Sequence, residues 1–136
     1  MRQQHGTIVS LYALAQVVTA QGNDARSQAL YEESIAVARK AGDRRTVAFG
    51  LEGFASVVAA QGELAWAARL WGAAEALRET TGAPLPPVEH VPYERAVVAA
   101  CAQLGEKSFA ASWAEGRLVT LEQALVTPGR VRVFGV

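Results

Sequence analysis

One short segment has the residue types of a phosphate-binding loop. Gly105-Glu106-Lys107-Ser108 places a glycine, a lysine and a hydroxyl group close together. A phosphate loop needs lysine directly after a glycine, and a second glycine at a fixed upstream spacing, so that backbone N–H groups surround the phosphate. Neither feature is present. We therefore interpret the segment as the start of a helix, where Glu106 favours the positive end of the helix dipole.

The other reactive side chains do not form the groupings that catalysis or metal binding requires. His5 lies near the start of the sequence and His90 in a proline-rich segment, and we interpret both as surface histidines, because zinc sites are built from clustered ligands. Cys101 stands among alanines, which favours a buried, inert thiol. Glu32 and Glu33 diverge by about 100° on a helix and cannot share a proton. We predict no catalytic residue, no metal ligand, no cofactor and no enzyme activity.

The composition indicates a globular chain without a strong preference for charged partners. Its 136 residues are 51% hydrophobic, enough to bury a core in one domain. Thirteen basic residues balance thirteen acidic ones, so direct binding to nucleic acid is not expected. The single cysteine excludes an internal disulfide. With no signal segment and no run of about 18 apolar residues, we expect a soluble, cytoplasmic protein that does not enter a membrane.

The sequence repeats itself at an interval of forty residues. Ala20-Gln21-Gly22 aligns with Ala60-Gln61-Gly62, and the aromatic Tyr31 aligns with the aromatic Trp71. Both side-chain size and the position of glycine are thus kept. The other aligned pairs include Leu11 and Leu51, Ala15 and Ala55, Ala25 and Ala65, Leu30 and Leu70, Ala36 and Ala76, and Gly42 and Gly82.

Each repeat is predicted to be a helical hairpin, because two stretches of helical periodicity are separated by a glycine that suits the left-handed position after a helix. Asn23 or Asp24 is expected to cap the second helix of the first hairpin, and Asp43 the first helix of the second. The hairpins span residues 7–41 and 43–81, with helices over about 7–21, 24–41, 43–61 and 63–80.

Large apolar side chains at helical spacing are expected to form the seam between the hairpins. Trp66 points about 140° away from Trp71 on the same helix, so it needs a separate cover. We expect that cover from a third helical pair, with a subunit contact as the alternative. The predicted seam consists of Leu14, Val18, Leu30, Tyr31, Phe54, Val58, Leu70 and Trp71.

The pattern changes after Gly82, where three prolines favour an extended link over residues 82–91. Capping helices are predicted over residues 92–126, at about 92–104, 106–115 and 121–126. The last of these begins with a capping box formed by Thr120 and Gln123. Residues 127–136 form a tail with the alternating pattern of a short strand. The whole chain is expected to be a single helical-repeat domain.

Small and large side chains follow the same order in both repeats. The order is Leu14, Ala15, Val18, Gly22, Ser27, Tyr31 and Ser34 in the first, and Phe54, Ala55, Val58, Gly62, Ala67, Trp71 and Ala74 in the second. This register resembles that of tetratricopeptide repeats, although their period is about 34 residues and their closing proline is replaced by Gly42 and Gly82. The resemblance implies an all-α, tetratricopeptide-like right-handed superhelix of antiparallel helical hairpins with a C-terminal capping helix pair.

A second resemblance covers residues 70–125, through the segments 70–78, 82–87, 93–95 and 113–117. This stretch resembles the C-terminal end of the helical-repeat region in large bacterial signalling ATPases and in LuxR-type or AfsR-type transcriptional regulators. The resemblance implies a non-catalytic protein–protein interaction or signal-relay module. Its partner would be another protein or the other domains of a larger regulator, and a homodimer is expected. The alternative is a small-effector-binding accessory domain of a signalling protein.

In tetratricopeptide-like arrays a ligand usually lies in the groove lined by the first helix of each hairpin. The side chains that this register places there are small and mixed, without the lysine and arginine cluster that clamps a peptide carboxylate. Ordinary exposure to solvent therefore remains as good an interpretation as recognition. The predicted binding residues are Tyr12, Gln16, Thr19, Phe49, Glu52 and Ser56.

Overall fold

The computed structural model describes Gly22, residues 24–82 and residues 87–125. Over these residues the chain is all-α, as predicted. The predicted first helix and the predicted strand-like tail lie outside the described residues. None of the described helices has the length and apolarity needed to cross a membrane. The helices are α2 (Asp24–Lys40), α3 (Arg44–Ala60), α4 (Leu64–Thr81), α5 (Pro87–Leu104), α6 (Glu106–Leu118) and α7 (Leu121–Ala124).

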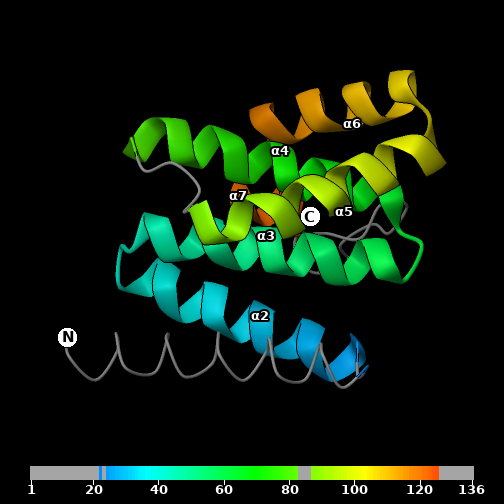
Figure 1. Cartoon of the computed structure of the whole chain (residues 1–136). Helices are drawn as coiled ribbons and strands as arrows, with labels where there is room; N and C mark the ends of the chain where they lie inside the picture. The colour runs from blue at the N-terminus through cyan, green and yellow to red at the C-terminus, as the bar shows by residue number, and fades with distance from the viewer. Residues whose placement is uncertain (1–21, 23, 83–86, 126–136) are drawn as a thin grey trace.

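Four of these helices form a row in the order α2, α3, α4 and α6, in which each helix packs against the next (Figure 1). Consecutive helices α2, α3 and α4 run in opposite directions. Helix α5 crosses in front of α3 and α4 in the view of Figure 1, and the short α7 lies behind them and contacts α4. The helix that extends the row beyond α4 is thus α6, and not the next helix in the chain.

The glycines of the repeat end the helices as their spacing predicted. Gly42, Gly62 and Gly82 follow α2, α3 and α4 with φ values of 72°, 88° and 68°, a conformation that glycine adopts without steric cost. Asp43 caps α3, because its Oδ1 accepts the backbone N–H of Thr46 at 3.2 Å and its Oδ2 accepts the Thr46 hydroxyl at 2.7 Å. These local signals explain why the observed helix ends agree closely with the predicted ones.

The described part of the predicted seam forms the core. Full burial of one such side chain contributes about 1.5–3 kcal/mol to folding. Leu30 is half-buried and packs against this core, whereas Leu14 and Val18 lie outside the described residues. The buried seam residues are Tyr31, Phe54, Val58, Leu70 and Trp71.

Two predicted helix ends in the second half of the chain are wrong. Helix α5 begins at Pro87 and not at Pro92, because proline fits the first turn of a helix, where its missing N–H has no helical partner. Helix α6 continues to Leu118, beyond the predicted end at residue 115. Gly116 therefore lies inside a helix, where it packs against α4.

The predicted capping box at the start of α7 is present. The Thr120 backbone N–H donates to Gln123 Oε1 at 2.9 Å, and the Gln123 backbone N–H donates to Thr120 Oγ1 at 3.2 Å. This helix contributes to the cover of Trp66. The Trp66 indole N–H donates to the carbonyl oxygen of Ala124 at 2.8 Å, and its ring lies edge-on to Phe54, with ring centroids 5.3 Å apart.

Helix α6 reaches α4 through two glycines. A Cβ atom on Gly72 would overlap the carbonyl oxygen of Trp113, and a Cβ atom on Gly116 would overlap the carbonyl oxygen of Arg69. Without side chains at these positions the two backbones meet directly, closer than helices with larger interface residues can pack. The close approach of α6 to α4 thus depends on backbone contact at these two glycines.

Candidate functional site

Three of the six predicted groove residues lie on one face of α3. Phe49, Glu52 and Ser56 follow one another at intervals of three and four residues, which places them on the same side of the helix. The other three, Tyr12, Gln16 and Thr19, lie outside the described residues. The structure therefore places half of the predicted set on one shared face of α3. The contacts of these three side chains are described next.

Glu52 is held by an arginine from the neighbouring helix. Arg78 of α4 donates from Nε to Glu52 Oε2 and from Nη2 to Glu52 Oε1, both at 2.6 Å. Each residue is only 8% exposed, so this two-point ion pair is shielded from water. The Arg78 guanidinium carbon also lies 4.7 Å from the centre of the Phe49 ring, and the Ser56 hydroxyl donates to the backbone carbonyl of Glu52 at 3.2 Å. The side chains on this face of α3 thus contact other groups of the same chain.

An aromatic cluster adjoins this pair between α4, α5 and α6. The Trp71 ring lies 6.3 Å from both Tyr93 and Phe109, and Phe109 lies 5.5 Å from Trp113. Burial raises the pKa of Tyr93 well above its usual range, and the nearby carboxylate of Glu52 adds to this shift. The Trp71 indole N–H is buried without a hydrogen-bond partner. The cluster thus packs aromatic rings from α4, α5 and α6 against one another.

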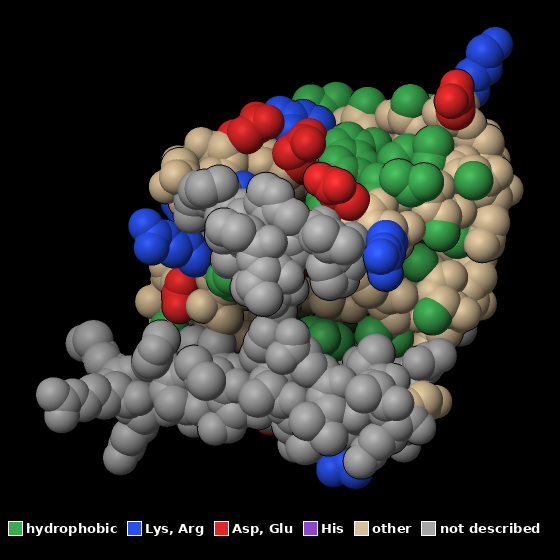
Figure 2. Space-filling view, viewed as in Figure 1, with side chains coloured by type: hydrophobic (Ala, Val, Ile, Leu, Met, Phe, Trp, Pro, Cys, Tyr) green, Lys and Arg blue, Asp and Glu red, His purple; other side chains and the backbone are tan. Residues whose placement is uncertain are grey.

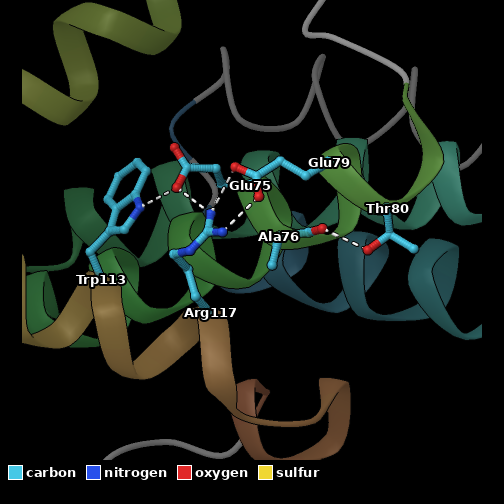
Figure 3. A network of polar contacts seen from close by, with 6 residues as sticks. All are labelled: Glu75, Ala76, Glu79, Thr80, Trp113 and Arg117. Atoms are coloured by element: carbon cyan, nitrogen blue, oxygen red, sulfur yellow. Dashed lines mark hydrogen bonds and ion pairs between the residues drawn. The ribbon is translucent and has the colours of Figure 1, made fainter.

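A second polar network joins α4 to α6 (Figure 3). The Glu75 carboxylate accepts the Trp113 indole N–H at 2.9 Å and Arg117 Nη1 at 2.6 Å, and Arg117 Nη2 donates to Glu79 at 2.6 Å. These residues were not predicted as a group from the sequence. Two signals could have indicated them, since Glu75 and Glu79, like Trp113 and Arg117, are four residues apart and therefore share a helix face.

The contact with Arg117 should make Glu79 more acidic in the folded chain. Hydrogen bonding to Arg117 lowers the pKa of Glu79, and the same bonds raise the pKa of Arg117. Because the folded-state pKa of Glu79 lies below its unfolded-state pKa, this contribution to stability is present above the unfolded-state pKa and is lost as pH falls through the folded-state pKa. We expect a carboxyl ¹³C NMR titration to show a lowered pKa for Glu79 in the wild-type chain.

The matched variant for this titration is Arg117→Met, which keeps an unbranched apolar stem of similar shape but removes the guanidinium. Its Glu79 pKa should return to the ordinary range. A Glu79 pKa that is equally low in the variant would show that Arg117 is not the cause.

The Glu52, Glu75 and Glu79 carboxylates described above each pair with an arginine. Cys101 is half-buried at the surface of the core. Within residues 24–82 and 87–125 there is no cluster of histidine, cysteine, aspartate and glutamate that could hold a metal ion. His90 belongs to α5, whereas His5 lies outside the described residues.

The described surface carries an apolar patch over α5 and α6. Leu118 is 87% exposed and Val98 is 66% exposed, and Figure 2 shows hydrophobic side chains gathered over these two helices. Ala111, Ala114 and Leu118 are all exposed and share one side of α6, which we call the outer face of α6. The buried Gly116 marks the opposite side, where α6 meets α4.

Comparison with known proteins gave no relative from which a function could be taken. No protein-family model, no curated protein and no solved structure matched the chain.

Proposed function

We propose that this chain is a non-catalytic protein-interaction module of a bacterial transcriptional regulator, acting in the cytoplasm and built as a tetratricopeptide-like right-handed superhelix of helical hairpins. The observation that supports an interaction role is the outer face of α6, where Leu118 is 87% exposed. Apolar patches on a protein surface mark sites of association. Burying such a surface in a complex contributes about 25 cal/mol for each Å² removed from water.

The position of α6 at the end of the row supports the proposal that a partner docks on its outer face. In the row α2, α3, α4 and α6, each helix is covered by the next, and a terminal helix of a repeat array normally presents a polar outer surface. Ala111, Ala114 and Leu118 give this one an apolar surface instead. A partner helix laid along it would continue the row, with the small alanines allowing close approach.

The partner that we propose is a second copy of the chain. Two copies of α6 laid antiparallel about the centre of the outer face would place Ala111 of one opposite Ala114 of the other. Lys107 is exposed four residues before Ala111 and so continues the same stripe, and Glu115 is exposed beside it. In this arrangement the lysine of one copy lies opposite Leu118 of the other and within a helical turn of its glutamate. Close approach at the alanines and pairing of Lys107 with Glu115 between the copies support a two-fold interface, in which both partners use the same surface.

The dimer is tested by placing a charge on the outer face. The wild-type chain should sediment as a dimer in analytical ultracentrifugation, and Ala111→Glu should raise the dimer dissociation constant by about 100-fold, since an unpaired buried charge costs several kcal/mol. Ala36→Glu is the matched control, because Ala36 is exposed on α2 at the other end of the row. It should leave the dissociation constant unchanged. A wild-type chain that stays monomeric at high concentration, or an equal effect of both variants, would refute the dimer.

A further inference from the structure

A pocket of about 210 Å³ lies behind the row, between α4 and the connection from α6 to α7. Most of its walls are apolar, and they come from distant parts of the sequence. The apolar lining includes Leu51 of α3, Ala73, Ala76 and Leu77 of α4, and Val119 and Leu121 at the start of α7. None of these residues belongs to the groove predicted from sequence or to the outer face of α6.

Contacts outside the pocket keep its walls apart. The glycine crossing at Gly72 and Gly116 fixes how closely α6 approaches α4. The Trp66 indole bonds the Ala124 carbonyl at 2.8 Å, and Glu122 pairs with Arg39 of α2, so α7 is held at both sides. The α4 residues that face the space between these fixed points include alanines, which are too small to fill it. The space is therefore a consequence of how the helices are anchored.

The walls of the pocket present no unmatched charge. Arg117 is the charged residue of the lining, and its guanidinium pairs with Glu75 and Glu79 beyond the pocket (Figure 3). The hydroxyl of Thr80 donates to the carbonyl oxygen of Ala76 at 3.0 Å. A charged ligand would lose hydration here without gaining a partner, which is unfavourable by several kcal/mol. An uncharged apolar ligand would not meet this penalty.

We propose that this pocket binds a small, uncharged, apolar molecule the size of one aromatic ring with a short substituent or a fused ring. An apolar cavity of about 150 Å³ is large enough to take up benzene, so a pocket of about 210 Å³ has room for two or three further heavy atoms. A free molecule of this size matches the volume of the pocket, and its lack of charge matches a lining in which Arg117 is already paired with glutamates.

The ligand site is separate from the proposed dimer face, but the two are connected through α6. Arg117 lines the pocket, and the next residue, Leu118, belongs to the outer face. A ligand that fills the pocket supports the C-terminal end of α6 from the inside. Binding can therefore change how firmly the outer face is held without any contact between ligand and partner.

The test uses indole as the probe and the full chain labelled on its methyl groups. We expect saturable shifts confined to methyl signals of the pocket lining, among them those of Leu51, Leu77, Val119 and Leu121, with a dissociation constant on the order of 0.1–1 mM for a ligand of this size. Benzoate, which carries a charge, should bind at least about tenfold more weakly than indole. The absence of shifts with indole, or equal binding of benzoate, would overturn the proposal.

A variant in which a larger side chain fills the pocket provides the matched comparison for indole binding. Ala73→Leu should weaken indole binding by at least about tenfold because the added side chain occupies the space, whereas Ala36→Leu on the exposed side of α2 should not change it. Equal affinity in both variants would show that indole binds elsewhere and would overturn the assignment. If Ala73→Leu does not fold, Ala76→Leu replaces it, and the map of methyl shifts in the wild-type chain decides independently. Shifts produced by an apolar peptide and not by indole would also refute a small-molecule site.

Discussion

Replacing Gly116 with alanine should destabilise the chain by about 3 kcal/mol. The added Cβ atom would overlap the backbone carbonyl oxygen of Arg69, which cannot turn away as a flexible side chain could. Relief requires α6 to move away from α4, and that movement would also disturb the contact at Gly72. Helix propensity alone predicts the opposite sign, since alanine is favoured over glycine by about 1 kcal/mol inside a helix. Urea denaturation followed by circular dichroism measures the difference.

The control for this prediction is Ala36→Gly, the reverse exchange inside α2 and away from the proposed dimer face. Ala36 is exposed, so its replacement should cost only the propensity difference of about 1 kcal/mol. Gly72→Ala should resemble Gly116→Ala, because its Cβ would meet the Trp113 carbonyl oxygen. A neutral or stabilising Gly116→Ala would mean that α4 and α6 are not in backbone contact.

The sequence predicted the elements of the repeat well because their ends depend on local chemistry. Asp43 bonds a backbone N–H three residues away, and Gly42 and Gly62 adopt the left-handed conformation that their place in the repeat required. Such signals act within one turn of helix, so they can be read without knowing the fold. Burial of Phe54 and Trp71 followed for a related reason, because helical spacing alone places them on one face.

The packing of the third helical pair could not be predicted in the same way. Gly116 resembles a helix end when only its neighbours in sequence are considered, but it lies inside α6 because Arg69 approaches it from α4. Trp66 was correctly expected to need a cover, yet nothing near it in sequence indicates that Ala124 provides one. Contacts between residues this far apart are decided by which helices meet, and helix periodicity carries no information about that choice.

The contacts of single side chains in the predicted groove could not be predicted from the sequence either. The common face of Phe49, Glu52 and Ser56 follows from their spacing and is present. The engagement of Glu52 follows from Arg78, which lies on the next helix. A glutamate one turn from a phenylalanine is compatible with an open groove or with a buried ion pair, and the register between α3 and α4 decides between them.

Arg78→Met should destabilise the chain by about 3–5 kcal/mol, the cost of leaving one member of a buried ion pair without its partner. The Glu52 carboxylate would lose both of its 2.6 Å bonds to the guanidinium at a position that is 8% exposed. The contact between the guanidinium and the Phe49 ring would also be lost, which adds about 1 kcal/mol. The free energy of unfolding in urea should fall accordingly, whereas Glu94→Met, at an exposed position on α5, should change it little.

The double variant Glu52→Met, Arg78→Met separates the ion pair from simple loss of packing. Because two apolar side chains of similar length leave no buried charge, the double variant should be more stable than Arg78→Met alone, and the two changes should couple by about 2–3 kcal/mol. Additive effects would show that the two charges do not depend on each other. Strong coupling would mean that the main role of the pair is to align α3 with α4. The two charges stabilise the fold only in the register that brings them together, and in any other register each would be buried without a partner.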